Sequence, residues 1–295
     1  MIKIKRIICL SAVVAALGCL TGGSFGVRTN YTYDNGDKYV AGDREISENI
    51  EILDIDYVSG EITLNESDTE KISIKETAKV TLDDKQKVHT WVNGSTLYVR
   101  YCASAKGLDL NDLDKKLTMD MPKGIELSKL KIQLSSGDLS GGCAAKNIKL
   151  NASSGNLTFE QKGSSEEISV EVSSGKIDLT AENADDVKLI SSSGEIKADI
   201  EKVKNYKSES SSGDENISFT NVPEETSIVA SSGDITLHLP KDASVSADIS
   251  TSSGDVSSDI EHSKPNKDGN KYVFGGGKNK MSISTSSGDV EILGK

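Results

Sequence analysis

Aromatic residues are scarce in this sequence, and basic residues are scarce relative to acidic ones. Aromatics make up 4% of the 295 residues, so any core must be thin and built from aliphatic side chains. The 34 lysines and arginines are outnumbered by 46 aspartates and glutamates, which gives a formal net charge of -12. This balance argues against a nucleic-acid partner, because a phosphate backbone requires a basic face.

Residues that carry catalysis or bind metals are also few. The three histidines, His89, His238 and His262, are not spaced as metal ligands, and we expect them to face solvent. Beyond residue 26 no Gly-x-Ser-x-Gly elbow occurs, and the glycines at 275–277 lack the following Lys-Ser/Thr pair and the helix of a phosphate loop. The last arginine is Arg100, whereas a polysaccharide lyase needs a basic residue in its groove. The sequence therefore predicts no enzyme, no metal site and no cofactor, and a glycan-acting enzyme is the remaining enzymatic alternative.

The N-terminus carries an export signal. Lys3, Lys5 and Arg6 form a positive region, and the apolar stretch at 7–17 is too short to span a bilayer as a helix. The sequence ALGC at 16–19 resembles a bacterial lipobox, in which the cysteine is lipidated, although its alanine and leucine are interchanged. We predict a signal peptide at 1–19 and lipidation of Cys19. Ordinary cleavage near residues 23–26 and an uncleaved anchor are the alternatives.

Two cysteines, Cys102 and Cys143, lie beyond the signal and can enter the fold. Neither belongs to a Cys-x-x-Cys pair or lies beside a histidine. They are either two separate buried thiols or, in the oxidising environment of an exported protein, one disulfide.

A Ser-Gly phrase set between alternating apolar residues recurs about every twenty residues. Its glycines, at intervals of 18 to 21 residues, are Gly137, Gly155, Gly175, Gly194, Gly213, Gly233 and Gly254. Gly60 and Gly288 carry the same phrase outside the regular run. A fixed period of this length is typical of a solenoid, in which each coil buries its apolar face only against its neighbours.

The apolar residues around each glycine lie at alternate places, which predicts two strands with one buried face. Around Gly155 they are Ile148, Leu150, Leu157 and Phe159. After Gly213 the pattern resumes late, at Ile217 and Phe219, which predicts a local bulge. The predicted fold is all-β, a single parallel β-solenoid with coils of about 19–20 residues and a bend at each Ser-Gly. The alternative is an antiparallel sandwich with a hairpin at each Ser-Gly.

Three segments depart from the period. Residues 20–45 are polar and contain glycine, which indicates a tether before a β-solenoid domain at 46–295. The stretch between Gly60 and Gly137 reads as a degenerate N-terminal part of the same rod, with 104–116 as a short helix or an excursion. Residues 262–280 exceed one coil and are predicted to form a protruding inserted loop.

Three stretches, at 39–64, 117–141 and 274–292, resemble the bacterial putative adhesin family. This family consists of exported domains of unknown function with repeated Ser-Ser-Gly-Asp phrases. The stretches are similar to its opening strand segment, its proline-marked entry to the repeats and its closing coil, and the resemblance covers most of residues 39–295. It implies a β-solenoid on the cell surface and brings no catalytic residues.

The residue after each bend glycine is usually acidic. In stacked coils these residues form one column on an edge of the rod, interrupted by Asn156 and Lys176. The acidic members are Asp138, Glu195, Asp214, Asp234, Asp255 and Asp289, with Glu61 before them. One interpretation is a turn-favouring residue at an exposed bend. The other is a column that recruits calcium or a cationic partner, although the calcium-binding nonapeptide pattern is absent.

These observations predict a non-enzymatic, adhesin-like interaction protein in the cell envelope, outside the cytoplasm and anchored to the membrane through an N-terminal lipid. Its partner would be a cell-surface protein, a peptide or another envelope component. The alternative function is envelope-stress regulation through a membrane partner or a cationic peptide.

Overall fold

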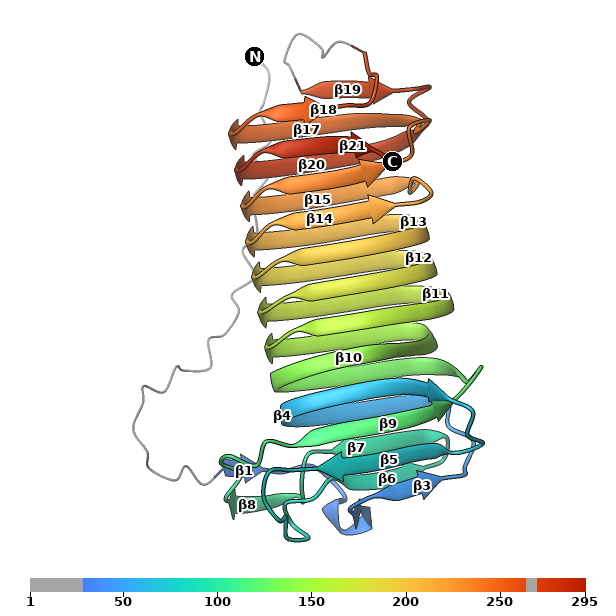
Figure 1. The fold of residues 1–295 in the computed structure, drawn as a ribbon, viewed down its shortest axis with the longest axis vertical. Helices are drawn as coiled ribbons and strands as arrows, with labels where there is room; N and C mark the ends of the chain where they lie inside the picture. Colours follow the sequence, from blue (N-terminus) through green and yellow to red (C-terminus); the bar gives the residue numbers. More distant parts are fainter. Residues whose placement is uncertain (1–28, 264–269) are drawn as a thin grey trace, which may run out of the picture.

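The computed structural model describes residues 29–263 and 270–295, and nearly all of their regular structure is β-strand (Figure 1). The predicted all-β class is confirmed. The described residues contain one short 3-10 helix, η1 (Gly36–Lys38), and none of them lies in a helix long and apolar enough to cross a membrane. The predicted signal peptide, Cys19 and the first part of the predicted tether lie outside the described residues.

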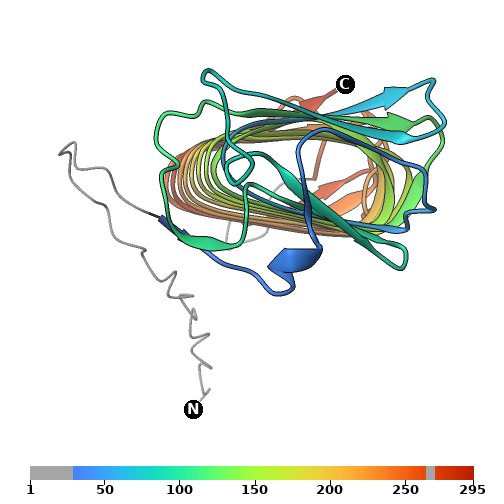
Figure 2. The same cartoon turned by 90° about the horizontal axis from the view of Figure 1, so that it is seen from below.

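The middle of the chain forms coils that stack in register. Strands β11 (Leu157–Ser174), β12 (Ile177–Ser193) and β13 (Ile196–Ser212) each run from one Ser-Gly bend to the next and pair in parallel. The antiparallel alternative is therefore wrong, because a hairpin at each Ser-Gly would pair the flanking strands in opposite directions. Viewed from its end, the rod shows these coils superimposed in one flattened outline (Figure 2).

The same stacking extends beyond these three strands. On one side lie β10 (Glu126–Ser154) and β4 (Ile52–Ser67), where Leu53 stands opposite Leu130 across 77 residues of sequence. On the other side lie β14 (Glu215–Phe219), β15 (Glu225–Ser232) and β16 (Ile235–Leu239), all parallel to their neighbours. One long and largely parallel sheet thus runs through the rod.

Aliphatic side chains at alternate places fill the interior, as the sequence pattern predicted. Ile168, Val170 and Leu189 are at most 1% exposed, and equivalent residues of other coils lie above and below them. Burial of apolar surface stabilises a fold by roughly 25 cal/mol per Å². Each coil therefore depends on its neighbours to cover its aliphatic side chains.

The predicted bulge after Gly213 is wrong. Ile217 stands opposite Ala198 and Phe219 opposite Ile200, without any shift of register. Glu215 occupies the inward place that an apolar residue fills in most coils, and it is only 1% exposed. The apolar alternation after Gly213 resumes late in the sequence because Glu215 replaces one residue of the aliphatic row.

The last coil of the sequence is not the last coil of the rod. β20 (Asn279–Ser287) and β21 (Val290–Gly294) lie between the coil of β15 and β16 and the coil of β17 (Val245–Ser253) and β18 (Val256–Ser258). Ile283 accordingly pairs with Ile228 on one side and with Ile249 on the other. Figure 1 shows β20 and β21 within the stack, below β17 and β18.

This insertion revises the loop predicted at 262–280. Within it, β19 (Lys271–Phe274) pairs antiparallel with β17 at the end of the rod, and Asn279 already belongs to β20. Residues 264–269 lie outside the described residues. β19 thus lies at the end of the rod, and from it the chain returns through β20 to the place of the inserted coil.

The other end of the rod is closed by a cap. β7 (Thr96–Arg100) and β9 (Lys116–Pro122) pair in parallel with β4, as the degenerate coil predicted from the sequence would. β5 (Ile72–Thr77) and β6 (His89–Asn93) pair antiparallel with them, which the prediction did not foresee. Residues 104–116 make an excursion that includes β8 (Ala105–Leu108) and no helix.

Much of the predicted tether is folded onto this cap. β1 (Thr29–Tyr31), β2 (Val40–Ala41) and β3 (Arg44–Ile46) pair antiparallel with β8, β6 and β5. The Tyr31 hydroxyl donates to the Asp56 carbonyl at 3.0 Å, and the Tyr33 hydroxyl donates to the Cys102 carbonyl at 2.8 Å. The tether prediction is wrong for residues 29–45, because tyrosines in a polar segment attach it to the cap.

Candidate functional site

The Ser-Gly bends lie along one edge of the rod, the left edge in Figure 1. Backbone crowding allows only glycine at the bend. Gly155, for example, has φ +118, and a Cβ there would lie 1.9 Å from the Gly137 carbonyl oxygen of the preceding coil. Neither the dihedral angle nor the space suits another residue. The set shares this positive φ: Gly137, Gly155, Gly175, Gly194, Gly213, Gly233, Gly254 and Gly288.

The acidic residues after the bends form a hydrogen-bonded column. The Asp214 carboxylate accepts from the Asp234 backbone N–H at 3.0 Å, and Asp234 accepts from the Asp289 N–H at 2.8 Å. Asp289 in turn accepts from the Asp255 N–H at 2.8 Å. Because of the inserted coil, the order along the rod is Asp214, Asp234, Asp289, Asp255. The carboxylates of Asp214, Asp234 and Asp289 thus each pair a backbone donor of the next coil.

The column continues less regularly toward the cap. Asp138 accepts from the Asn156 N–H at 2.7 Å, and the Asn156 side chain accepts from the Lys176 N–H at 3.1 Å. Lys176 forms an exposed ion pair with Glu195 at 3.3 Å. Within the described ranges, no three His, Cys, Asp or Glu side chains are grouped so that they could hold a metal ion. Recruitment of calcium or a cationic partner by the column stays a prediction.

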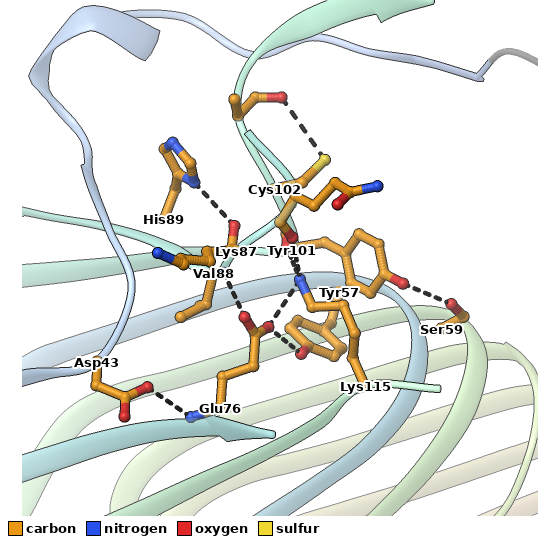
Figure 3. A network of polar contacts seen from close by, with 12 residues as sticks. Asp43, Tyr57, Ser59, Glu76, Lys87, Val88, His89, Tyr101, Cys102 and Lys115 are labelled. Carbon is orange, nitrogen blue, oxygen red and sulfur yellow. Dashed lines mark hydrogen bonds and ion pairs between the residues drawn. The ribbon is translucent and has the colours of Figure 1, made fainter. Parts of the chain in front are cut away.

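A buried ion pair closes the core at the cap (Figure 3). Lys115 is 0% exposed, and its Nζ lies 2.7 Å from Glu76 Oε1. The same ammonium donates to the carbonyls of Gln86, at 2.6 Å, and Tyr101. Its three donors are therefore paired, and burial lowers its pKa from the ordinary lysine value. The arrangement is a structural latch between segments of the cap.

Glu76 is equally well paired. Its Oε1 accepts from the Tyr57 hydroxyl at 2.9 Å, and its Oε2 accepts from the Val88 backbone N–H at 2.7 Å. The Lys115 carbonyl lies where the next coil would place a bend, since it accepts the Glu61 N–H at 3.0 Å. No spacing in the sequence brings these residues together, which is why the sequence did not reveal them.

The two cysteines of the fold are separate buried thiols, so the disulfide alternative is wrong. Burial raises the pKa of both Cys102 and Cys143 to about 12. His89 departs from the predicted solvent-facing position. It is 8% exposed, its Nδ1 lies 2.9 Å from the Lys87 carbonyl, and burial lowers its pKa.

A second buried acid lies inside the rod. Glu215 is bonded by the Ser208 hydroxyl, and its Oε1 has no hydrogen-bond partner among the described residues. The Tyr206 ring packs edge-on against Phe219, with centroids 5.0 Å apart. Burial raises the pKa of Glu215 to about 7 and that of Tyr206 well above its ordinary value. The sequence signal for Glu215 was present, as a charged residue at an inward place.

Comparison with known proteins identifies one protein family. The sequence matches the family described as Toastrack DUF4097 over residues 50–293. No curated protein matches it.

Three solved structures are similar at low sequence identity. A putative adhesin from Bacteroides fragilis is 15% identical, with a TM-score of 0.47, and the match covers 86% of this chain and 97% of that one. A putative lipid binding protein from Parabacteroides distasonis is 17% identical, with a TM-score of 0.42 and coverage of 85% and 95%. A putative cell adhesion protein from Clostridium sporogenes is 15% identical, with a TM-score of 0.25 and coverage of 88% and 100%.

Proposed function

The chain belongs to the Toastrack DUF4097 family, and from this premise we propose that it is a parallel β-solenoid displayed outside the cytoplasmic membrane as a non-enzymatic interaction protein. Lipidation of Cys19 anchors it, and the rod binds a cell-surface protein, a peptide or another envelope component. Three features of the sequence support this proposal: the export signal, the lipobox-like cysteine and the repeat with alternating apolar residues.

The observation that carries the proposal is the attachment of the N-terminal segment to one end of the rod. β1 pairs with β8 in the cap, and Tyr31 and Tyr33 bond to backbone carbonyls there. Cys19 precedes Thr29 by ten residues, a stretch that spans at most about 35 Å when extended. A lipid at Cys19 would therefore hold the cap close to the membrane.

The long stack of coils then offers an extended surface for binding. Solenoids commonly bind partners over such surfaces, because each coil adds equivalent side chains beside those of its neighbours. In this chain the flat faces and the bend edge carry serine, threonine, asparagine and charged residues in rows across successive coils. Such rows suit a contact made by many weak interactions.

The anchor is tested by phase partition in a nonionic detergent. Wild-type protein is expected in the detergent phase, and Cys19→Ala is expected to release it or to block processing. Cys9→Ala, which removes a cysteine within the signal, serves as the matched control and is expected to partition as wild type. Recovery of the wild type as a soluble species that starts after residue 23 would contradict lipid anchoring.

A further inference from the structure

A concave surface lies at the corner opposite the Ser-Gly bends, at the right edge of the rod in Figure 1, where the chain passes from β14 to β15. It has a volume of about 860 Å³, and Val203 and Val222 contribute to its lining. Four lysines surround it, and we call this site the lysine basin: Lys202, Lys204, Lys278 and Lys280. A volume of this size is typical of ligand sites.

The inserted coil creates this basin. The Glu224 N–H donates to the Lys204 carbonyl at 2.8 Å, and the Lys280 N–H donates to the Glu224 carbonyl at 3.0 Å. The Asn279 side chain donates to the Val222 carbonyl at 3.1 Å. These bonds bring lysines from β13 and from the C-terminal segment to one corner. Stacking in sequence order would instead have brought Ser246, which pairs with Lys280 on its other side.

The charges of the basin are only partly compensated. Lys204 pairs with Asp185 at 2.6 Å, and Lys280 pairs with Glu225 at 3.8 Å. Both members of each pair are about half exposed or more. Exposed pairs of this kind contribute little and exchange readily with other ions. Lys202 and Lys278 form no ion pair with any described residue. The lining thus sets four lysines against two carboxylates, Glu224 and Glu225, and keeps a local excess of positive charge on a chain whose formal charge is -12.

The basin opens onto a groove that continues along the rod. Asn205, Glu225 and Lys280 line both. The groove, of about 570 Å³, adds two lysines and two carboxylates from neighbouring coils, so the excess positive charge lies in the basin: Lys188, Lys207, Glu167 and Asp186. The two sites together extend over several coils along the rod. A chain molecule fits this shape better than a single small anion.

We infer that the lysine basin binds a linear, phosphate-bearing polyanion of the cell envelope. A lysine ammonium is a compact point charge with three rotatable donors, so it accepts phosphate oxygens from many directions. Successive lysines can then contact successive phosphates of one chain, with release of counterions. This inference rests on the proposed display of the rod in the envelope.

The experiment measures binding of the full-length protein, in nonionic detergent, to long-chain inorganic polyphosphate. Binding is expected, and it is expected to weaken as salt rises. Changing the four basin lysines to glutamine should lower the affinity by about tenfold or more, whereas changing them to arginine should retain it. The matched control changes four exposed lysines of the cap region to glutamine and should leave the affinity nearly unchanged: Lys75, Lys79, Lys85 and Lys106. Circular dichroism establishes that each variant is folded.

Three other polymers define the ligand class. Neutral dextran should not bind. Polyglutamate should bind more weakly than polyphosphate because it carries carboxylates, and a short DNA duplex should bind more weakly because its stiff double helix cannot follow a concave corner. An equal loss in the basin and cap variants would overturn the site, because the effect would then come from net charge alone. Equally tight binding of DNA or polyglutamate would overturn the ligand class. Absence of polyphosphate binding by protein that is correctly anchored through Cys19 would overturn this inference and leave the proposed anchoring intact.

Discussion

Among single residues, Glu215 is the one whose environment conflicts most with its chemistry. The row it belongs to is aliphatic in the coils beside it, with Ile196 on one side and Ile235 on the other. Its carboxyl group is bonded by Ser208 while Oε1 has no partner in the part of the chain that the structure describes, so the ionised form is penalised by desolvation. This single buried acid should make the stability of the rod depend on pH.

The sign of that dependence follows from the two pKa values. Unfolding returns Glu215 from a pKa of about 7 to 4.5, so between these values the folded state holds a proton that the unfolded state has lost. The free energy of unfolding should therefore fall by about 3 kcal/mol as pH rises from 4.5 to 7, and stay low above 7. Glu215→Gln should remove this contribution, as measured by urea denaturation across the range. Glu171→Gln, at an exposed place, is the control and should keep it. An identical pH slope in wild type and Glu215→Gln would contradict the assignment.

Among structural elements, the acidic column along the bend edge combines a structural role, in accepting backbone hydrogen bonds, with a predicted role in recruiting cations. Its carboxylates accept backbone N–H groups of the next coil, so replacement by serine would disturb the fold together with any ligand site. Asparagine keeps an acceptor oxygen and removes the charge. The distinction allows binding and stability to be tested independently.

For the column, Asp→Asn at Asp214, Asp234, Asp289 and Asp255 should leave the melting temperature nearly unchanged. Asp→Ala at the same places should lower the free energy of unfolding by about 1 kcal/mol for each lost bond. If the column recruits cations, calcium or a cationic peptide should bind to the wild type and not to the asparagine variant in a titration. The binding should weaken as salt rises. Equal binding by both proteins, or no binding by either, would show that the acidic residues serve only as turn-favouring residues at the bends.

For the whole molecule, the position of the C-terminal coil decides what holds the far end together. β20 and β21 pair with coils on both sides, so their loss separates β15 and β16 from β17 and β18. A central coil is different, because its deletion joins neighbouring coils directly through the chain, whereas residues 240–244, which join β16 to β17, already pass the inserted coil.

Deletion of residues 279–295 should therefore expose the segment beyond β16 to proteolysis and broaden the thermal transition. Deletion of residues 177–195, of comparable length, joins Lys176 to Ile196 and should give a shorter rod that resists the protease and melts cooperatively. The measurements are limited proteolysis and circular dichroism during heating. Equal resistance of both deletion variants would show that the inserted coil is dispensable.

The sequence by itself determined the repeated part of this protein. The alternation of apolar residues established which side chains face inward, and the Ser-Gly phrase established where the chain bends, because both depend on residues close together in sequence. The rows of Ile168 and Val187, and the bend at Gly155, could be predicted without any structure. The acidic column could be predicted as a row, though its hydrogen bonds could not.

Tertiary structure alone decided the two ends and the sites that depend on them. The pairing of β20 with both β15 and β17, the Lys115–Glu76 latch and the lysine basin each join segments distant in sequence. All coils carry nearly the same pattern, so the pattern cannot specify which coil stacks on which. That order is set by the length and path of the connecting segments and by the packing at each end of the rod, and these act only when the chain is folded.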